Sequence, residues 1–174
     1  ALGYLGKDVS FGGNQLLVTD SQVSGASYTL AGSASVKAII TDASGRAIYE
    51  KDLGQQTAGA HDFQWNGRTN AGQKAPAGTY TLNLVATNSQ GEAVKVSDQQ
   101  VTARVTGYQK GSDGKGYLLV GSTSLPLAKV VAVREPAASA SALSSYLNGS
   151  GGEGGTSLTD SALNYIKGLL GLNG

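Results

Sequence analysis

Hydrophobic and polar residues alternate most regularly between residues 79 and 87. Tyr80, Leu82, Leu84 and Ala86 fall on one side of an extended chain, and threonine and asparagine take most positions between them. Alternation with a period of two is typical of a strand that is buried on one face only. The pattern therefore predicts a half-buried strand in an antiparallel sheet.

An aromatic pair precedes this strand. Phe63 and Trp65 are two positions apart, so both side chains point to the same face of an extended segment. Gly67, Gly72, Pro76 and Gly78 follow, and such residues allow a chain to turn back at low cost. We predict a strand, a long structured turn and a second strand. The predicted core anchors are Phe63, Trp65, Tyr80, Leu82 and Leu84.

Two further hairpins have similar turns. The segments 42–45 and 88–91 each begin with Asp or Asn and end with Gly, and each lies between strand-like segments. The segment 25–98 is therefore predicted to be a sandwich of short strands. It is shorter than the ~100 residues of an immunoglobulin domain, and it has no cysteine pair to link its sheets.

Short strand-like segments also occur near both ends of this region, at residues 7–11, 15–18, 101–107, 117–120 and 129–133. Such short strands do not bury enough apolar surface alone. We therefore predict that residues 1–24 and 99–135 pair into one small β-barrel, with the sandwich of residues 25–98 inserted between them.

Residues 136–174 form a tail rich in glycine, serine and alanine, for which we predict one or two short helices. Apolar residues recur there at helical spacing. A short helix needs a partner for its apolar stripe. Docking onto a neighbouring subunit or onto the chain's own barrel and a frayed tail remain alternatives. The candidate self-association residues are Leu158, Tyr165, Ile166 and Leu169.

Composition limits the function classes. The 174 residues carry a net charge of +1, which does not favour binding to nucleic acid or to an anionic membrane. Cysteine is absent, which excludes disulfides, thiolate metal sites and a cysteine nucleophile. No segment approaches the ~20 apolar residues of a membrane span.

Candidate chemistry is sparse, and we predict no catalytic, cofactor or metal site. His61 is the only histidine, and no recognisable motif places a partner beside it, so a strand-edge residue is favoured over a general base. The segment 111–116 has Gly116 where a phosphate-binding loop needs Ser or Thr, which favours a hairpin tip. Asp42 and Asp113 lack the ligand spacing of a calcium loop.

Aromatic residues leave one binding alternative. Trp65, Tyr80 and Tyr117 could form a platform for a carbohydrate, but a single tryptophan beside apolar strands is more typical of a core anchor. A bare Trp65 beside a groove would favour the platform.

Several segments resemble the flagellar hook-capping protein family, also called hook assembly scaffolding proteins. The resemblance is carried by residues 5–9 (LGKDV), 63–67 (FQWNG), 71–72 (AG), 76–80 (PAGTY), 86–91 (ATNSQG) and 101–107 (VTARVTG), and it covers residues 5–133. It implies an all-β fold in which a fibronectin type III-like sandwich is inserted into a Tudor-like barrel made from both chain ends.

The resemblance also implies a non-enzymatic role. Such proteins are exported through the flagellar type III apparatus and form an oligomeric cap on the growing hook, where they contact the hook protein outside the cell. The chain starts without Met, and the family's long N-terminal segment, which carries the export contacts, is expected to be missing. The alternative function is a secreted accessory module that binds carbohydrate or mediates adhesion.

Overall fold

The structure is a computed structural model that describes residues 2–136. These residues contain twelve strands, two short 3-10 helices and no α-helix. The elements are η1 (Leu2–Tyr4), β1 (Asp8–Gly12), β2 (Gln15–Val18), β3 (Gly25–Leu30), β4 (Ala34–Thr41), β5 (Ala47–Gln56), β6 (Gly59–Gln64), β7 (Gly78–Thr87), β8 (Val96–Arg104), β9 (Gly107–Lys110), β10 (Gly116–Val120), β11 (Thr123–Pro126), η2 (Leu127–Lys129) and β12 (Val130–Arg134).

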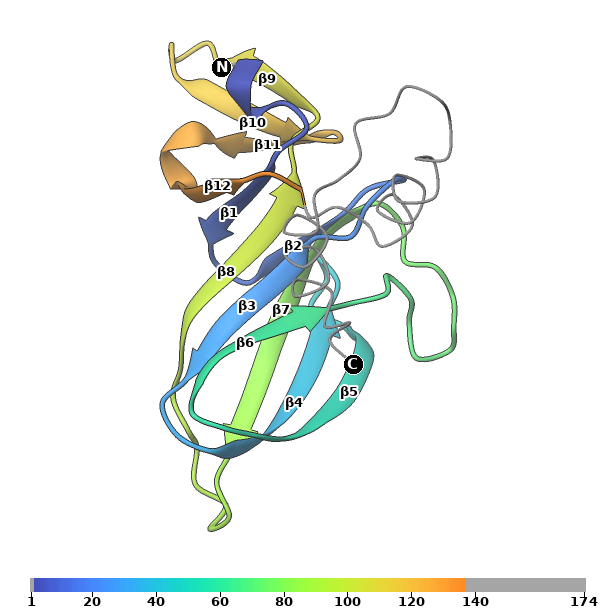
Figure 1. Cartoon of the computed structure of the whole chain (residues 1–174). Coiled ribbons are helices and arrows are strands. Elements are labelled where there is room, and N and C mark those ends of the chain that lie inside the picture. Colours follow the sequence, from blue (N-terminus) through green and yellow to red (C-terminus); the bar gives the residue numbers. More distant parts are fainter. Residues whose placement is uncertain (1, 137–174) are drawn as a thin grey trace, which may run out of the picture. The chain divides into compact units, whose positions relative to one another are not determined.

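The strands form three antiparallel sheets (Figure 1). The first has four strands in the order β2-β7-β4-β5, and the second has five in the order β12-β1-β8-β3-β6. The third contains β11-β10-β9. The prediction of an all-β protein is confirmed for residues 2–136, whereas the predicted tail helices lie outside the described residues.

The strand β7 has the alternation that its sequence predicts. Tyr80, Leu82 and Ala86 are buried, Leu84 is half-buried, and the residues between them are more exposed. β4 alternates in the same way and pairs with β7 along its length. The apolar faces of both strands therefore point to one side of the four-stranded sheet.

The main core contains the buried side chains of the four- and five-stranded sheets. Trp65 is 1% exposed and meets Tyr80 edge to face, with 5.3 Å between the ring centroids. Phe63 is also buried. Aromatic pairs in this geometry add to the free energy gained from burial alone. Trp65 thus joins the end of β6 to the start of β7.

The two ends of the described chain pair with each other. β1 lies between β12 and β8, with Val9 opposite Val133 on one side and opposite Ala103 on the other. A small apolar cluster of Val9, Val105 and Leu118 joins these strands to β10. Within residues 2–136 the strands do not close into a hydrogen-bonded barrel, because β9, β10 and β11 form their own sheet.

The strand β2 differs from the layout expected from the sequence. The sequence predicts that residues 1–24 belong to the chain-end part, but Gln15–Val18 pairs with β7 in the four-stranded sheet. Leu16, Leu17 and Val18 are all buried, so this strand has apolar contacts on both faces. Such a strand has no alternation, and its sequence therefore does not show which sheet it joins.

Candidate interaction surface

A long loop, residues 65–77, connects β6 of the five-stranded sheet to β7 of the four-stranded sheet and projects to one side (Figure 1). Its base is fixed by two hydrogen bonds and by one buried side chain. The indole Nε1 of Trp65 donates to the carbonyl of Arg68 at 2.9 Å, the backbone N–H of Ala75 donates to the carbonyl of Gly67 at 2.8 Å, and Ala75 itself is buried. The loop is therefore held in one conformation by the core beneath it, although most of its side chains are exposed.

The far side of the loop is attached to β5 through Asn70. The side-chain Oδ1 of Asn70 accepts from the backbone N–H of Glu50 at 2.7 Å, and its Nδ2 donates to the carbonyl of Glu50 at 3.0 Å. The backbone N–H of Asn70 donates to the carbonyl of Ile48 at 3.2 Å. One residue thus satisfies three backbone groups on the outer edge of β5.

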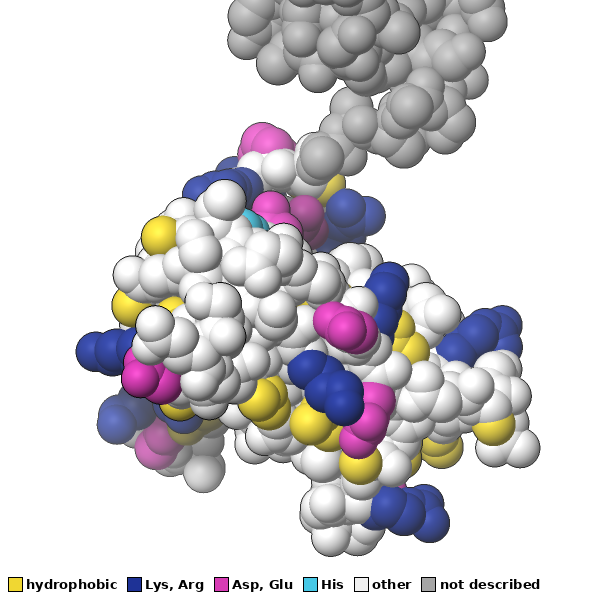
Figure 2. Space-filling model, turned by 90° about the horizontal axis from the view of Figure 1, so that it is seen from below, with side chains coloured by type: hydrophobic (Ala, Val, Ile, Leu, Met, Phe, Trp, Pro, Cys, Tyr) yellow, Lys and Arg dark blue, Asp and Glu magenta, His cyan; other side chains and the backbone are white. Residues whose placement is uncertain are grey.

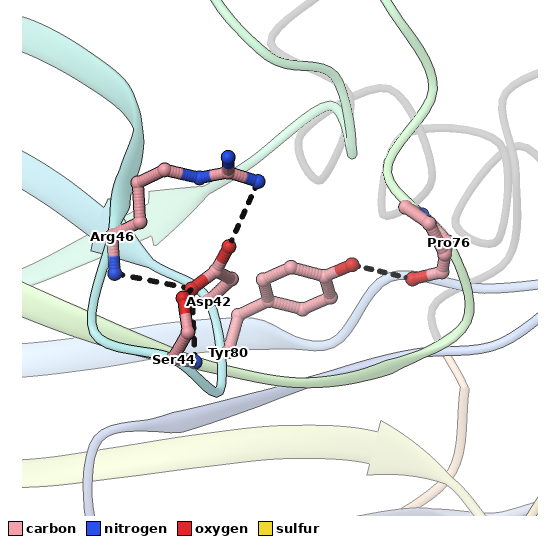
Figure 3. A network of polar contacts seen from close by, with 5 residues as sticks. All are labelled: Asp42, Ser44, Arg46, Pro76 and Tyr80. Atoms are coloured by element: carbon pink, nitrogen blue, oxygen red, sulfur yellow. Dashed lines mark hydrogen bonds and ion pairs between the residues drawn. The ribbon is translucent and has the colours of Figure 1, made fainter.

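The turn between β4 and β5 lies beside this loop (Figure 3). Asp42 Oδ1 accepts from the Ser44 hydroxyl at 2.6 Å and from the backbone N–H groups of Ser44 and Arg46 at 3.0 and 3.1 Å. The Arg46 guanidinium lies 3.4 Å from the other carboxylate oxygen. The Ser44 hydroxyl in particular, together with these N–H groups and the Arg46 charge, lowers the pKa of Asp42.

An open hollow separates the turn from the loop. It is lined by Asp42, Arg46, Ile48, Pro76 and Tyr80, among others. The Tyr80 hydroxyl donates to the carbonyl of Pro76 at 2.6 Å, as Figure 3 shows, and this hydrogen bond attaches the end of the loop to β7. Burial, and secondarily the charge of Asp42, raises the pKa of Tyr80. The polar groups that line the hollow bond within the turn and within the loop, so we treat the hollow as a candidate contact surface.

Charges of both signs are interspersed on the face seen in Figure 2, and the hydrophobic side chains there form small separate spots. The ion pairs in the described part of the chain are Lys7–Glu135, Lys37–Glu50, Asp42–Arg46 and Asp8–Arg104. Surfaces of this kind suit specific, polar protein contacts better than capture of an apolar ligand.

Trp65, the central residue of the candidate carbohydrate platform, is not accessible to a sugar. Trp65 is 1% exposed and Tyr80 is buried, so neither ring offers a face for stacking. Tyr117 lies in another sheet, where its hydroxyl donates to Asp113 at 2.7 Å. This hydrogen bond lowers the pKa of Asp113 and raises that of Tyr117.

The other candidate residues, His61 and the segment 111–116, make contacts within strands and turns. His61 lies in β6, an edge strand, with its Nε2 atom 2.7 Å from the carbonyl of Thr57 and its ring 5.8 Å from Tyr28. The segment 111–116 forms the tight turn between β9 and β10, in which Asp113 accepts from the N–H of Lys115. Among residues 2–136 no three His, Cys, Asp or Glu side chains gather as metal ligands.

Two other predictions from the sequence concern the tail and membranes. Leu158, Tyr165, Ile166 and Leu169 lie outside the described residues. Over the described part, no helix is long and apolar enough to cross a membrane.

The sequence did not reveal two side-chain amides that bind backbone across the fold. Asn70 binds Glu50, and Gln22 exchanges two 2.9 Å hydrogen bonds with the N–H and carbonyl of Arg104. Both residues lie in polar loops, where Asn and Gln are common and no spacing rule marks a distant backbone partner. Only the three-dimensional arrangement identifies them.

Comparisons with known proteins agree with this architecture. A family model for the FlgD Ig-like domain matches residues 13–90. The basal-body rod modification protein FlgD of Salmonella typhimurium is 38% identical over 79 residues, and that of Escherichia coli K12 is 37% identical over the same length. Each match covers 45% of this chain and 33% of the relative, so the matched part spans about a third of those proteins.

Solved structures match over a larger part of the chain. FlgD from Xanthomonas campestris, described in connection with the hook capping essential for flagellar assembly, is 30% identical with a TM-score of 0.61. That match covers 75% of this chain and 94% of the other. FlgD from P. aeruginosa is 27% identical with a TM-score of 0.56, over 73% and 95% of the two chains.

The packed antiparallel sheets and the family match define an all-β protein with an immunoglobulin-like region within residues 13–90. The similarity to the Xanthomonas structure extends beyond that region, over nearly the whole of the other chain. This chain belongs to the FlgD family of flagellar hook-capping proteins.

Proposed function

We propose that this chain acts as a non-enzymatic scaffold that caps the distal end of the growing flagellar hook and promotes addition of hook subunits. The observation that carries the proposal is the 30% identity and TM-score of 0.61 to the Xanthomonas hook-capping protein, over 94% of that structure. The fixed loop of residues 65–77 and the mixed charges around it suit a role in which shape and polar contact do the work. Its partner is the hook protein, and its place is the hook tip outside the cell, after export through the flagellar type III apparatus.

An exchange experiment tests this function. In a Salmonella strain, the segment of FlgD that matches this chain is replaced by residues 1–136, and hooks are counted and measured by electron microscopy. We expect the chimera to build hooks, and a second chimera with Trp65→Ala to build far fewer because the core is disrupted. A chimera that is exported and folded but builds no hooks would contradict the proposal.

We also propose the finer fold that the resemblance implies. In this interpretation, β2 and the strands from β3 to the start of β8 form a fibronectin type III-like sandwich, with β2 included because it pairs with β7. The chain-end strands form a Tudor-like, barrel-like body around Val9, Val105 and Leu118. The pairing of β1 with β12 and the shared apolar cluster support this division. The two parts need not unfold in separate transitions, because β8 pairs with strands of both parts.

We further propose that the working cap is a homo-oligomer and that Leu158, Tyr165, Ile166 and Leu169 contribute to self-association. The helical spacing of these apolar residues in the sequence supports this. Removing residues 150–174 should then lower the mass in solution without changing the melting temperature. An unchanged mass would exclude this role for the tail.

The secreted binding module remains the competing function, and a glycan screen separates the two. The burial of Trp65 removes the strongest sugar-stacking candidate. A glycan bound at micromolar affinity would nevertheless contradict a purely structural scaffold.

A further inference from the structure

The outer edge of β5 is closed at its centre by a side chain instead of a strand. β5 is the last strand of the four-stranded sheet, so one row of its backbone groups has no neighbouring strand. The amide of Asn70 supplies one acceptor to the N–H of Glu50 and one donor to its carbonyl, at 2.7 and 3.0 Å. A neighbouring strand would offer the same pair of groups through its backbone. Asn70 therefore occupies the place of an incoming strand.

The rest of this edge is interrupted by irregularities. The pairing of β4 with β5 shifts register near Thr41 and again near Val36. Gly54 has a φ of +75° and donates its N–H to Asp52 Oδ1 at 2.8 Å. Bulges and local turns of this kind twist a strand away from further pairing. The regular part of β5 is thus the short segment 49–52, and Asn70 covers the outward backbone groups of Glu50 within it.

We propose that Asn70 guards the outer edge of β5 against strand addition by a second copy of this chain. An uncovered antiparallel edge is self-complementary, because two copies related by a two-fold axis can pair the same strand with itself. In a pair centred on Lys51, Glu50 of one copy faces Asp52 of the other. Lys51 would also face Lys51, and like charges at facing positions destabilise such a pair, so charge adds to the barrier that Asn70 provides.

A different interpretation gives Asn70 only a local role. In that case its hydrogen bonds hold the loop of residues 65–77 in place and have no effect on association. The two interpretations predict different outcomes when the amide is removed. Loss of a loop anchor leaves the mass in solution unchanged, whereas loss of a guard raises it.

The principal test uses Asn70→Ala in the full chain, with mass measured by sedimentation in about 1 M NaCl, where screening limits charge repulsion to ~3 Å. We expect the mean mass to rise about twofold over that of the unaltered chain at equal concentration, as a two-fold pair requires. The matched control is Asn88→Ala, because the Asn88 side chain bonds within its own turn, to Gln90 and Glu92. This control should keep the mass of the unaltered chain.

A proline at Glu50 shows whether the added association uses β5. The N–H of Glu50 points to Asn70 and away from β4, so Glu50→Pro removes an outward donor and leaves the pairing with β4 in place. Glu50→Pro combined with Asn70→Ala should restore the original mass. A Lys51→Cys change in the Asn70→Ala chain should give disulfide-linked dimers, and Val131→Cys in the exposed edge strand β12 should not.

Three results would overturn the proposal: an unchanged mass for Asn70→Ala, no rescue by the proline, or cross-linking through residue 131 instead of residue 51. If Asn70→Ala does not fold, hydrogen exchange on the unaltered chain tests the closed edge that the proposal requires. The backbone N–H of Glu50 should then exchange its hydrogen at least about tenfold more slowly than the backbone N–H of Asp52, which also points to the outer edge of β5. Equal exchange rates would show that Asn70 does not close this edge.

Discussion

Trp65 should contribute more to stability than any other single side chain in the loop that it anchors. It is 1% exposed, contacts the rings of Tyr80 and Tyr49 with centroids 5.3 and 6.1 Å away, and donates to the carbonyl of Arg68. Replacing a buried Trp or Phe by Ala typically costs about 3–5 kcal/mol. The hydrogen bond that Trp65 donates to the carbonyl of Arg68 is part-buried, so its loss belongs to this cost. We therefore expect Trp65→Ala to lose about 3–5 kcal/mol of a total that is typically ~5–15 kcal/mol.

The assay is urea unfolding monitored by far-UV circular dichroism. Tryptophan fluorescence is unsuitable, because Trp65 is the only tryptophan and its removal abolishes that signal. Trp65→Phe should fall between the unaltered chain and Trp65→Ala, because it keeps an aromatic ring but loses the indole N–H. Tyr108→Ala is the matched control, since Tyr108 is 39% exposed, and it should cost less than about 1 kcal/mol. A loss below about 1 kcal/mol for Trp65→Ala would refute the claim that this ring holds the loop to the core.

Three further predictions concern backbone and charge. The lowered pKa of Asp42 means that its contribution to stability is present above its ordinary pKa of 3.8 and is lost as the pH falls below that value. Asp42→Asn should therefore flatten the fall in melting temperature between about pH 5 and pH 2, and an unchanged slope would contradict this. Asp98 has a φ of +50° at the bulge of β8, so Asp98→Val should cost about 1–2 kcal/mol while Asp98→Gly is nearly neutral in urea unfolding. Gly67 has a φ of +76°, and an added Cβ would lie 2.9 Å from Val23 Cγ2, so Gly67→Ala should lower the melting temperature more than Gly45→Ala, whose Cβ meets nothing within 4 Å.

The sequence predicted those parts of the fold in which a local pattern determines the structure. The alternation in β7 identified its buried face, and the Asp-to-Gly and Asn-to-Gly turns located the hairpins after Thr41 and Thr87. The pairing of strands from the two chain ends was also anticipated, because short strands need partners. These features follow from residues close together in the chain or from the need to bury apolar surface.

Features that depend on distant residues were not predictable. Leu16, Leu17 and Val18 are buried on both faces, so nothing in the segment shows that β2 joins β7. The attachment of Asn70 to Glu50 spans 20 positions and has no sequence signature. A side-chain amide in a polar loop has many possible partners, and only the folded chain selects one.

The predicted boundary between the sandwich and the chain-end part is the clearest example of a feature that local sequence cannot predict. The sequence placed it between residues 98 and 99, where the rhythm of apolar residues changes. The structure has no linker there, because β8 runs from Val96 to Arg104 and pairs with β3 along one part and β1 along another. The change in rhythm marks the bulge, at which Asp98 and Gln99 lie opposite the single residue Tyr28. A bulge shifts the alternation by one residue without ending the strand. Since the two parts share hydrogen-bonded strands of one sheet, bending between them would break ladder pairs, and the scaffold role that we propose would gain a stiff connection at this position.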